Sequence, residues 1–145
     1  MAVVGAGMID FGELFDQSLD DMAEAAYLDA LDDVDDGIEP SAIDAGWFGT
    51  IDIAGNASSG LGASHPTGLF GIPMARVENA CATGSTAFRS AVESVRAGSA
   101  DVALVLGAEK MRDSAAGLIE GAALDQVWRG RGVTMPAFFG LRATR

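Results

Sequence analysis

The chain has 145 residues, which is enough for one domain with a substantial apolar core. Its formal net charge is −12, because 21 acidic residues outnumber 9 basic ones. Nucleic acid and anionic membranes are therefore poor partners, since both are bound through basic surface. Much of the acid lies in residues 16–36, which predicts a solvated face or, alternatively, adaptation to high salt.

The cysteine content and the apolar segments predict a cytoplasmic protein. Cys81 is the sole cysteine and cannot form an internal disulfide, so a reducing compartment is the default. Residues 2–9 are apolar but lack the basic leader of a signal peptide. Residues 53–75 carry no charge, yet they are too rich in Gly, Ser, Asn and Pro to span a membrane.

The first half of the chain reads as strand, helix, strand. Residues 2–8 predict a short buried strand. Ser18, with Asp21 three residues later, predicts a helix start of the capping-box type. That helix should end in residues 32–37, where Asp and Gly favour turns, and residues 45–53 predict a second strand. The apolar face of the helix is expected to comprise Leu19, Met22, Ala23, Ala26 and Ala30.

The second half continues the alternation. Residues 55–71 predict a long loop with one short helical turn, and residues 73–77 a third strand. A helix should follow Cys81 and end at Gly98, and the apolar run 102–106 is typical of a central parallel strand. The helix is expected to bury one face made of Phe88, Ala91, Val92 and Val95.

This order of elements predicts an α/β fold with right-handed crossovers. Residues 1–110 are expected to form the α/β domain. Residues 111–145, rich in glycine, are expected to begin a covering loop domain with one or two short helices.

Cys81 is the strongest candidate for chemistry because it should stand where a strand ends and a helix begins. The first N–H groups of a helix are unpaired, and the helix dipole adds partial positive charge there. Both favour a nucleophilic thiolate, and the small neighbours Ala82, Gly84 and Ser85 leave room for a substrate. The alternative is a buried structural cysteine.

Two other candidate sites are weaker. Gly5 and Gly7 follow the first predicted strand, but the third glycine of a dinucleotide fingerprint and its acidic partner are missing. The single histidine, His65, lies in the predicted loop; it would have to fold back to act as a base for Cys81, so a surface position is favoured. Metal binding is not expected from one His and one Cys.

Four stretches resemble the thiolase family, in the branch of sterol-carrier-protein and archaeal or actinobacterial lipid-transfer thiolases. The main match is Asn79–Phe88, which contains Cys81, followed by Gly98–Met111. Val3–Glu13 resembles the family's opening, and Gly132–Phe139 resembles its covering loop. The resemblance implies a mostly parallel mixed sheet with packed helices and a partial loop domain.

By this resemblance, Cys81 matches the nucleophile that takes the acyl group from an acyl-CoA thioester. Coenzyme A is then part of the substrate, and no separate cofactor or metal is expected. The expected partners are a second copy, a complementing chain, or a small OB-fold zinc protein. Glu109, within the second match, is expected to fix a strand end and the loop domain. Glu78 and Asn79 are expected to lie at a dimer interface.

The sequence departs from the family pattern because only the first half of a thiolase is represented. The family's Gly-His-Pro histidine, second cysteine and thioester-binding Asn or His have no counterpart here, and His65-Pro66 precedes Cys81. The chain alone is therefore expected to have weak activity at most. Two alternatives stay open: a thiolase-like retro-aldolase acting on CoA esters, and a non-catalytic scaffold subunit.

Overall fold

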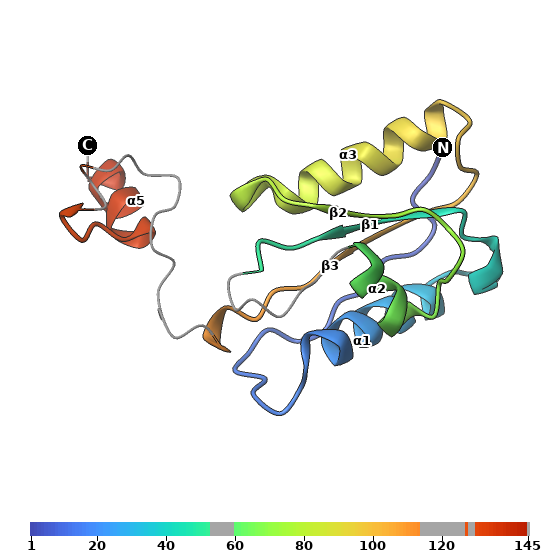
Figure 1. The fold of residues 1–145 in the computed structure, drawn as a ribbon, viewed down its shortest axis with the longest axis horizontal. Coiled ribbons are helices and arrows are strands. Elements are labelled where there is room, and N and C mark those ends of the chain that lie inside the picture. Colours follow the sequence, from blue (N-terminus) through green and yellow to red (C-terminus); the bar gives the residue numbers. More distant parts are fainter. Residues whose placement is uncertain (53–59, 114–126, 128–129, 145) are drawn as a thin grey trace.

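Three parallel strands form the sheet at the centre of the computed structural model, which describes residues 1–52, 60–113, 127 and 130–144 (Figure 1). The strands are β1 (Ala45–Gly49), β2 (Met74–Val77) and β3 (Ala103–Gly107), in the order β2-β1-β3. Both pairings are parallel, and Phe48 lies opposite Arg76 on one side and Leu106 on the other.

Helices cover both faces of this sheet. α1 (Leu19–Asp32) and α2 (Gly60–Thr67) lie on one face, and α3 (Thr83–Arg96) lies on the other (Figure 1). The α/β expectation is therefore confirmed. The main core lies between the sheet and the first two helices, and its buried members are Leu19, Ala23, Tyr27, Ile43, Phe48, Ala63, Leu69 and Leu106.

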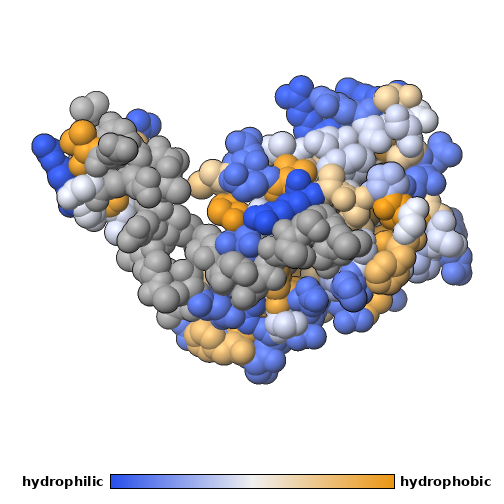
Figure 2. All heavy atoms as spheres, viewed as in Figure 1, coloured by the Kyte–Doolittle hydropathy of each residue, from blue (hydrophilic) through white to orange (hydrophobic). Residues whose placement is uncertain are grey.

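The start of α1 matches its sequence signature. Ser18 Oγ accepts the Asp21 backbone N–H at 3.0 Å, and Asp21 Oδ2 accepts the Ser18 N–H at 2.7 Å, so both partners of a capping box are present. The acidic side chains of residues 16–36 are all exposed, which confirms the solvated-face interpretation. Figure 2 shows hydrophilic side chains along the upper and lower edges of the view, over α3 and α1.

The prediction of a strand at residues 2–8 is wrong. This segment pairs with no strand among the described residues, and two of its backbone N–H groups are bound instead by carboxylates of α1 and of its C-cap residue. The Ala6 N–H donates to Asp33 Oδ2 and the Met8 N–H to Asp29 Oδ2, both at 2.9 Å. A short apolar run can indicate a buried strand, but it does not identify what satisfies the backbone hydrogen bonds.

Gly7 is where the N-terminal segment approaches α1 most closely. A Cβ at this position would lie 2.5 Å from the carbonyl oxygen of Ala26 and would also collide with the backbone N of Ala30. We predict that Gly7→Ala lowers the free energy of unfolding by about 2 kcal/mol, because backbone atoms cannot yield as a flexible side chain would. Chemical denaturation measures this effect.

Gly12→Ala is the matched control for Gly7→Ala, since its Cβ would meet just the Leu14 side chain, at an ordinary 3.8 Å. Equal stability of the two variants would contradict the close approach of the N-terminal segment to α1.

The prediction that residues 102–106 form a central strand is also wrong for the described sheet. β1 is central, and β3 lies at the edge. The free side of β3 faces an apolar groove of about 670 Å³. A continuous apolar run indicates burial on both faces of a strand, but it does not specify the strand's place in the sheet.

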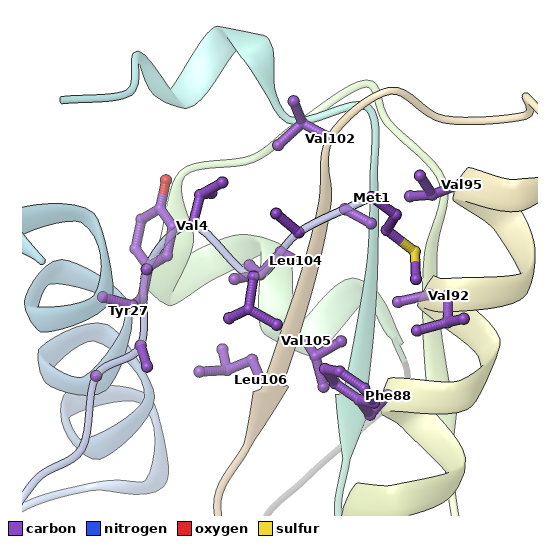
Figure 3. A pocket seen from close by; sticks show the side chains of 18 of the residues that line it. Met1, Val4, Tyr27, Phe88, Val92, Val95, Val102, Leu104, Val105 and Leu106 are labelled. Atoms are coloured by element: carbon purple, nitrogen blue, oxygen red, sulfur yellow. The ribbon is translucent and has the colours of Figure 1, made fainter. Parts of the chain in front are cut away.

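The groove lies between β3, α3 and the N-terminal segment (Figure 3). Phe88, Val92 and Val95 of α3 turn toward it, and Phe88 stays 49% exposed because the groove is open. The hydroxyl of Tyr27 also borders the groove and is buried without a hydrogen-bond partner within the described residues. Burial raises the pKa of this phenol.

Asp44 joins the starts of β1 and β3. Its Oδ2 accepts the Val102 N–H at 2.9 Å and the Asp101 N–H at 2.8 Å, and these two hydrogen bonds lower the pKa of the Asp44 carboxyl. A depressed pKa in the folded state means that Asp44 stabilises the fold fully above its unfolded pKa of about 3.9. The contribution is lost as the pH falls through the folded value.

We therefore predict that Asp44→Ala destabilises the protein at pH 7 and flattens the dependence of its melting temperature on pH below about 4. Thermal melts of both proteins between pH 2 and pH 7 measure this difference. Parallel pH profiles would contradict the role of Asp44. Asp20→Ala, which removes an exposed carboxylate from the first turn of α1, is the control for a simple change of net charge.

The remaining expectations are met in part. The single helical turn predicted within residues 55–71 is the eight-residue helix α2, and residues 53–59 lie outside the described part. Gly98 follows α3 with a φ of +70°, as expected of a residue that ends a helix. α5 (Met135–Ala143) is one of the short helices expected after residue 110, and Thr134 caps it. The domain boundary at residues 110/111 stays a prediction.

Candidate active site

Cys81 lies at the junction that the sequence predicted, between the end of β2 and the start of α3. It occupies a short 3₁₀ turn, η2 (Ala80–Ala82), directly ahead of Thr83, the first residue of α3. Its side chain is exposed in the described structure, unlike that of a buried structural cysteine. Because all three strands are parallel, Cys81 shares the carboxyl edge of the sheet with the ends of β1 and β3, where open α/β sheets bind ligands.

The turn that carries Cys81 is held by its neighbours. Ala80 has a left-handed backbone with φ +45°. Its N–H donates to Glu78 Oε1 at 2.7 Å, and its carbonyl accepts the Thr83 hydroxyl at 2.6 Å. Thr83 Oγ1 also accepts the Asn79 N–H at 2.8 Å, and Asn79 Nδ2 donates to Thr86 Oγ1 at 2.9 Å. The side chains of Glu78 and Asn79 thus bond within the turn; their expected place at a dimer interface stays a prediction.

Glu109 follows β3 and binds the residues that follow β1. Its Oε2 accepts the Thr50 hydroxyl at 3.1 Å, the Ile51 N–H at 2.8 Å and the Asp52 N–H at 3.1 Å. Asp52 has a left-handed backbone with φ +61°, and Thr50 is 2% exposed. The carboxylate therefore joins two strand ends at the edge where Cys81 lies, as the sequence suggested for Glu109.

Arg76 extends this cluster toward β2. Its Nη1 lies 3.7 Å from Asp52 Oδ2, and its Nη2 donates to the Ile51 carbonyl at 3.4 Å. The sequence reasoning missed Thr50, Asp52 and Arg76. Their positions at the ends of predicted strands could have revealed them. The carboxyl ends of neighbouring parallel strands meet at one edge of the sheet, so polar residues at those ends lie close together.

Lys110 is buried and its ammonium group binds neighbouring segments of the fold. It is 8% exposed, and its Nζ donates to the carbonyl of Leu14 at 3.0 Å and to the carbonyl of Gln17. An ion pair with Asp113 at 3.1 Å completes its surroundings. Lys110 thus ties the loop before α1 to the segment after β3.

The structure does not place His65 on Cys81. His65 lies on α2 rather than in a loop, is exposed, and packs edge-on against Phe70 with ring centroids 5.8 Å apart. No hydrogen bond joins it to Cys81 in the described part of the chain. Gly5 and Gly7 serve the packing of the N-terminal segment on α1, consistent with small residues required by close approach. Within the described ranges, no cluster of three His, Cys, Asp or Glu side chains could hold a metal ion.

The site is an exposed thiol on a hydrogen-bonded strand-to-helix turn at the edge of a parallel α/β sheet. The family model for the N-terminal domain of thiolases matches residues 1–128. The chain belongs to the thiolase family. The family expectation drawn from the motifs around Cys81 and Glu109 is thereby confirmed.

Several longer proteins are similar to this thiolase chain. It is 38% identical to the acetyl-CoA acetyltransferase of Methanothermobacter thermautotrophicus and 37% identical to that of Methanocaldococcus jannaschii, in both cases over the whole chain. Sterol carrier protein 2 of Gallus gallus is 41% identical over 75% of the chain. The chain spans 39%, 38% and 20% of these three relatives, respectively.

No helix in the described part of this thiolase chain is long and apolar enough to cross a membrane.

Proposed function

We propose that this chain supplies the nucleophile of a thiolase-type acyltransferase. The enzyme would move an acyl group from acyl-CoA through a thioester on Cys81, to form a C–C bond or to cleave a 3-ketoacyl-CoA. The observation that carries this proposal is the exposed Cys81 at the strand-to-helix turn of a thiolase N-terminal domain. Relatives named acetyl-CoA acetyltransferase support acetyl-CoA as a substrate.

The chemistry follows from the position of the thiol. The Cys81 thiolate attacks the thioester carbonyl, a sulfur–carbon bond forms, and coenzyme A leaves as its thiolate and takes up a proton. In the synthetic direction, the carbanion of a second acyl-CoA then takes the acyl group from Cys81. In the degradative direction, the Cys81 thiolate attacks the 3-keto carbonyl of a 3-ketoacyl-CoA instead, the bond between C2 and C3 breaks, and acetyl-CoA leaves as a carbanion that takes up a proton. The thiolate of free coenzyme A then takes the acyl group from Cys81. The backbone N–H of Cys81, at the helix start, is proposed to contribute to stabilising the oxyanion.

The general bases are proposed to lie in the part of a full-length thiolase that this chain does not represent. Coenzyme A acts as part of the substrate, with no separate cofactor. Assembly with a second copy, a complementing chain or a small OB-fold zinc protein, and work in lipid metabolism in the cytoplasm, are proposals that rest on family resemblance. The 145-residue chain alone should support a single acylation and no steady turnover.

The test is the intact mass of the chain after incubation with acetyl-CoA, followed by peptide mapping. One acetyl group on Cys81 is expected. Absence of an adduct from a folded chain, shown to be folded by circular dichroism, would contradict the proposal and favour a scaffold subunit. Retro-aldol cleavage of a CoA ester that persists after loss of Cys81 would favour the lyase alternative, since that reaction needs no thiol.

A further inference from the structure

We propose that Glu78 and Thr83 are positioning residues that hold Cys81 in its reactive place, an inference that rests on the proposed function of Cys81. Neither side chain touches the thiol in the described structure. Both instead bind the backbone of Ala80, the residue immediately before Cys81.

Ala80 needs such support because of its backbone. A residue with a Cβ in the left-handed region is strained by roughly 1–2 kcal/mol and persists where its surroundings enforce it. At Ala80, φ is +45°, and both backbone polar groups bind side chains; the carbonyl also accepts the backbone N–H of Thr83. Glu78 Oε1 accepts the N–H at 2.7 Å, and the Thr83 hydroxyl donates to the carbonyl at 2.6 Å. Rotation of Ala80 to an ordinary conformation would break this pair of bonds.

Thr83 can act as an anchor because it is fixed to the sheet. It is 7% exposed, and its Cγ2 lies 3.1 Å from where a Cβ would stand on Gly49, the last residue of β1. Its Oγ1 also accepts the Asn79 N–H at 2.8 Å, so one hydroxyl holds the chain on both sides of the peptide before Ala80. Glu78, by contrast, is exposed and reaches the turn from the end of β2.

The hydrogen bonds to Ala80 would pre-organise the Cys81 thiol for attack. A displacement of about 1 Å at a reacting atom can slow an enzymatic step about 100-fold, because attack requires a narrow range of distances and angles. Cys81 is exposed and makes no side-chain hydrogen bond in the described part of the protein, so the backbone turn is what places its Sγ.

The experiment compares variants of the full-length protein that carries this chain. Thr83→Val keeps the shape of the side chain and removes the hydroxyl, whereas Thr83→Ser keeps the hydroxyl. Glu78→Ala removes the acceptor, whereas Glu78→Gln keeps an amide oxygen. Two rates are measured for each protein, across pH 6 to 9: acetylation of Cys81 by acetyl-CoA and alkylation of Cys81 by iodoacetamide.

We expect Thr83→Val and Glu78→Ala to lower the acetylation rate by about 10- to 100-fold, and the two conservative variants to stay within about 3-fold of the parent. Alkylation is expected to fall less, because a small reagent tolerates a displaced thiol. If Thr83 had only a structural role, its substitution would lower the melting temperature, but Thr83→Val and Thr83→Ser would not differ in acetylation rate. If Thr83→Val does not fold, the comparison of Glu78→Ala with Glu78→Gln, at an exposed position, still tests the proposal.

Acetylation of Thr83→Val and Glu78→Ala at the parent rate would overturn the inference and leave the proposed function intact. Equal losses in Thr83→Val and Thr83→Ser would overturn the role of the hydroxyl. If the parent itself takes no acetyl group, the proposed function fails. Slower alkylation of Thr83→Val than of Thr83→Ser would then still support positioning of the thiol, whereas equal alkylation rates in all variants would overturn it.

Discussion

Cys81→Ser is expected to remove the acetyl adduct from the chain and to lower steady turnover of the full-length protein on the order of 10⁴-fold or more. The serine hydroxyl occupies nearly the same space, so the fold should be unchanged. It is a far weaker nucleophile than a thiolate at neutral pH, and the described structure brings no base to this position.

Intact mass after incubation with acetyl-CoA, and turnover by the full-length protein, measure the two effects of Cys81→Ser. The melting temperature serves as the fold control, since substitution of an exposed side chain changes stability little. Ser99→Ala, on the exposed loop before β3, is a matched surface control that should acylate normally. An adduct that survives on the serine variant would place the acyl group elsewhere and contradict the role of Cys81.

Glu109→Ala is expected to lower the free energy of unfolding by about 2–4 kcal/mol. The substitution removes the acceptor of the Thr50 hydroxyl and of the Ile51 N–H, and it removes one of the two acceptors of the Asp52 N–H, which also donates to Thr50 Oγ1 at 3.1 Å. Thr50 is 2% exposed, so water cannot readily replace the carboxylate there. The left-handed Asp52 would also lose a bond that holds its conformation.

Urea denaturation measures the effect of Glu109→Ala, and Glu109→Gln should retain part of the stability because its amide oxygen can still accept. Glu93→Ala is the matched control. Its carboxylate pairs with Arg89 at 2.8 Å on the exposed face of α3, where an ion pair contributes little. Losses of the same size in Glu109→Ala and Glu93→Ala would show that Glu109 does not hold the strand ends together.

Local patterns in the sequence correctly predicted the elements whose causes are local. Ser18 and Asp21 define the start of α1 through bonds that span three residues, and Gly98 ends α3 because it adopts a left-handed backbone. The junction of β2 and α3 at Cys81 was also predicted correctly, because the strand and helix patterns lie in the residues on either side of it. The Arg89–Glu93 pair follows from helical spacing alone.

Long-range contacts account for the errors and omissions. The place of β3 at the sheet edge depends on which strand pairs with which, and the pattern of one strand carries no such information. The same holds for residues 2–8, whose backbone bonds go to two carboxylates more than twenty residues away. Arg76 and Asp52 were missed because they meet only when β1 and β2 lie side by side.

The sequence by itself determined the thiolase family, the α/β alternation and the identity of the candidate nucleophile, because motifs and helix signals are written in neighbouring residues. Tertiary structure alone decided how Thr83, which holds the turn at Cys81, packs against β1, and how Glu109 joins two strand ends. Those contacts bring together residues such as Gly49 and Thr83, or Thr50 and Glu109, which are far apart along the chain. Packing of parallel strands with aligned carboxyl ends creates that proximity.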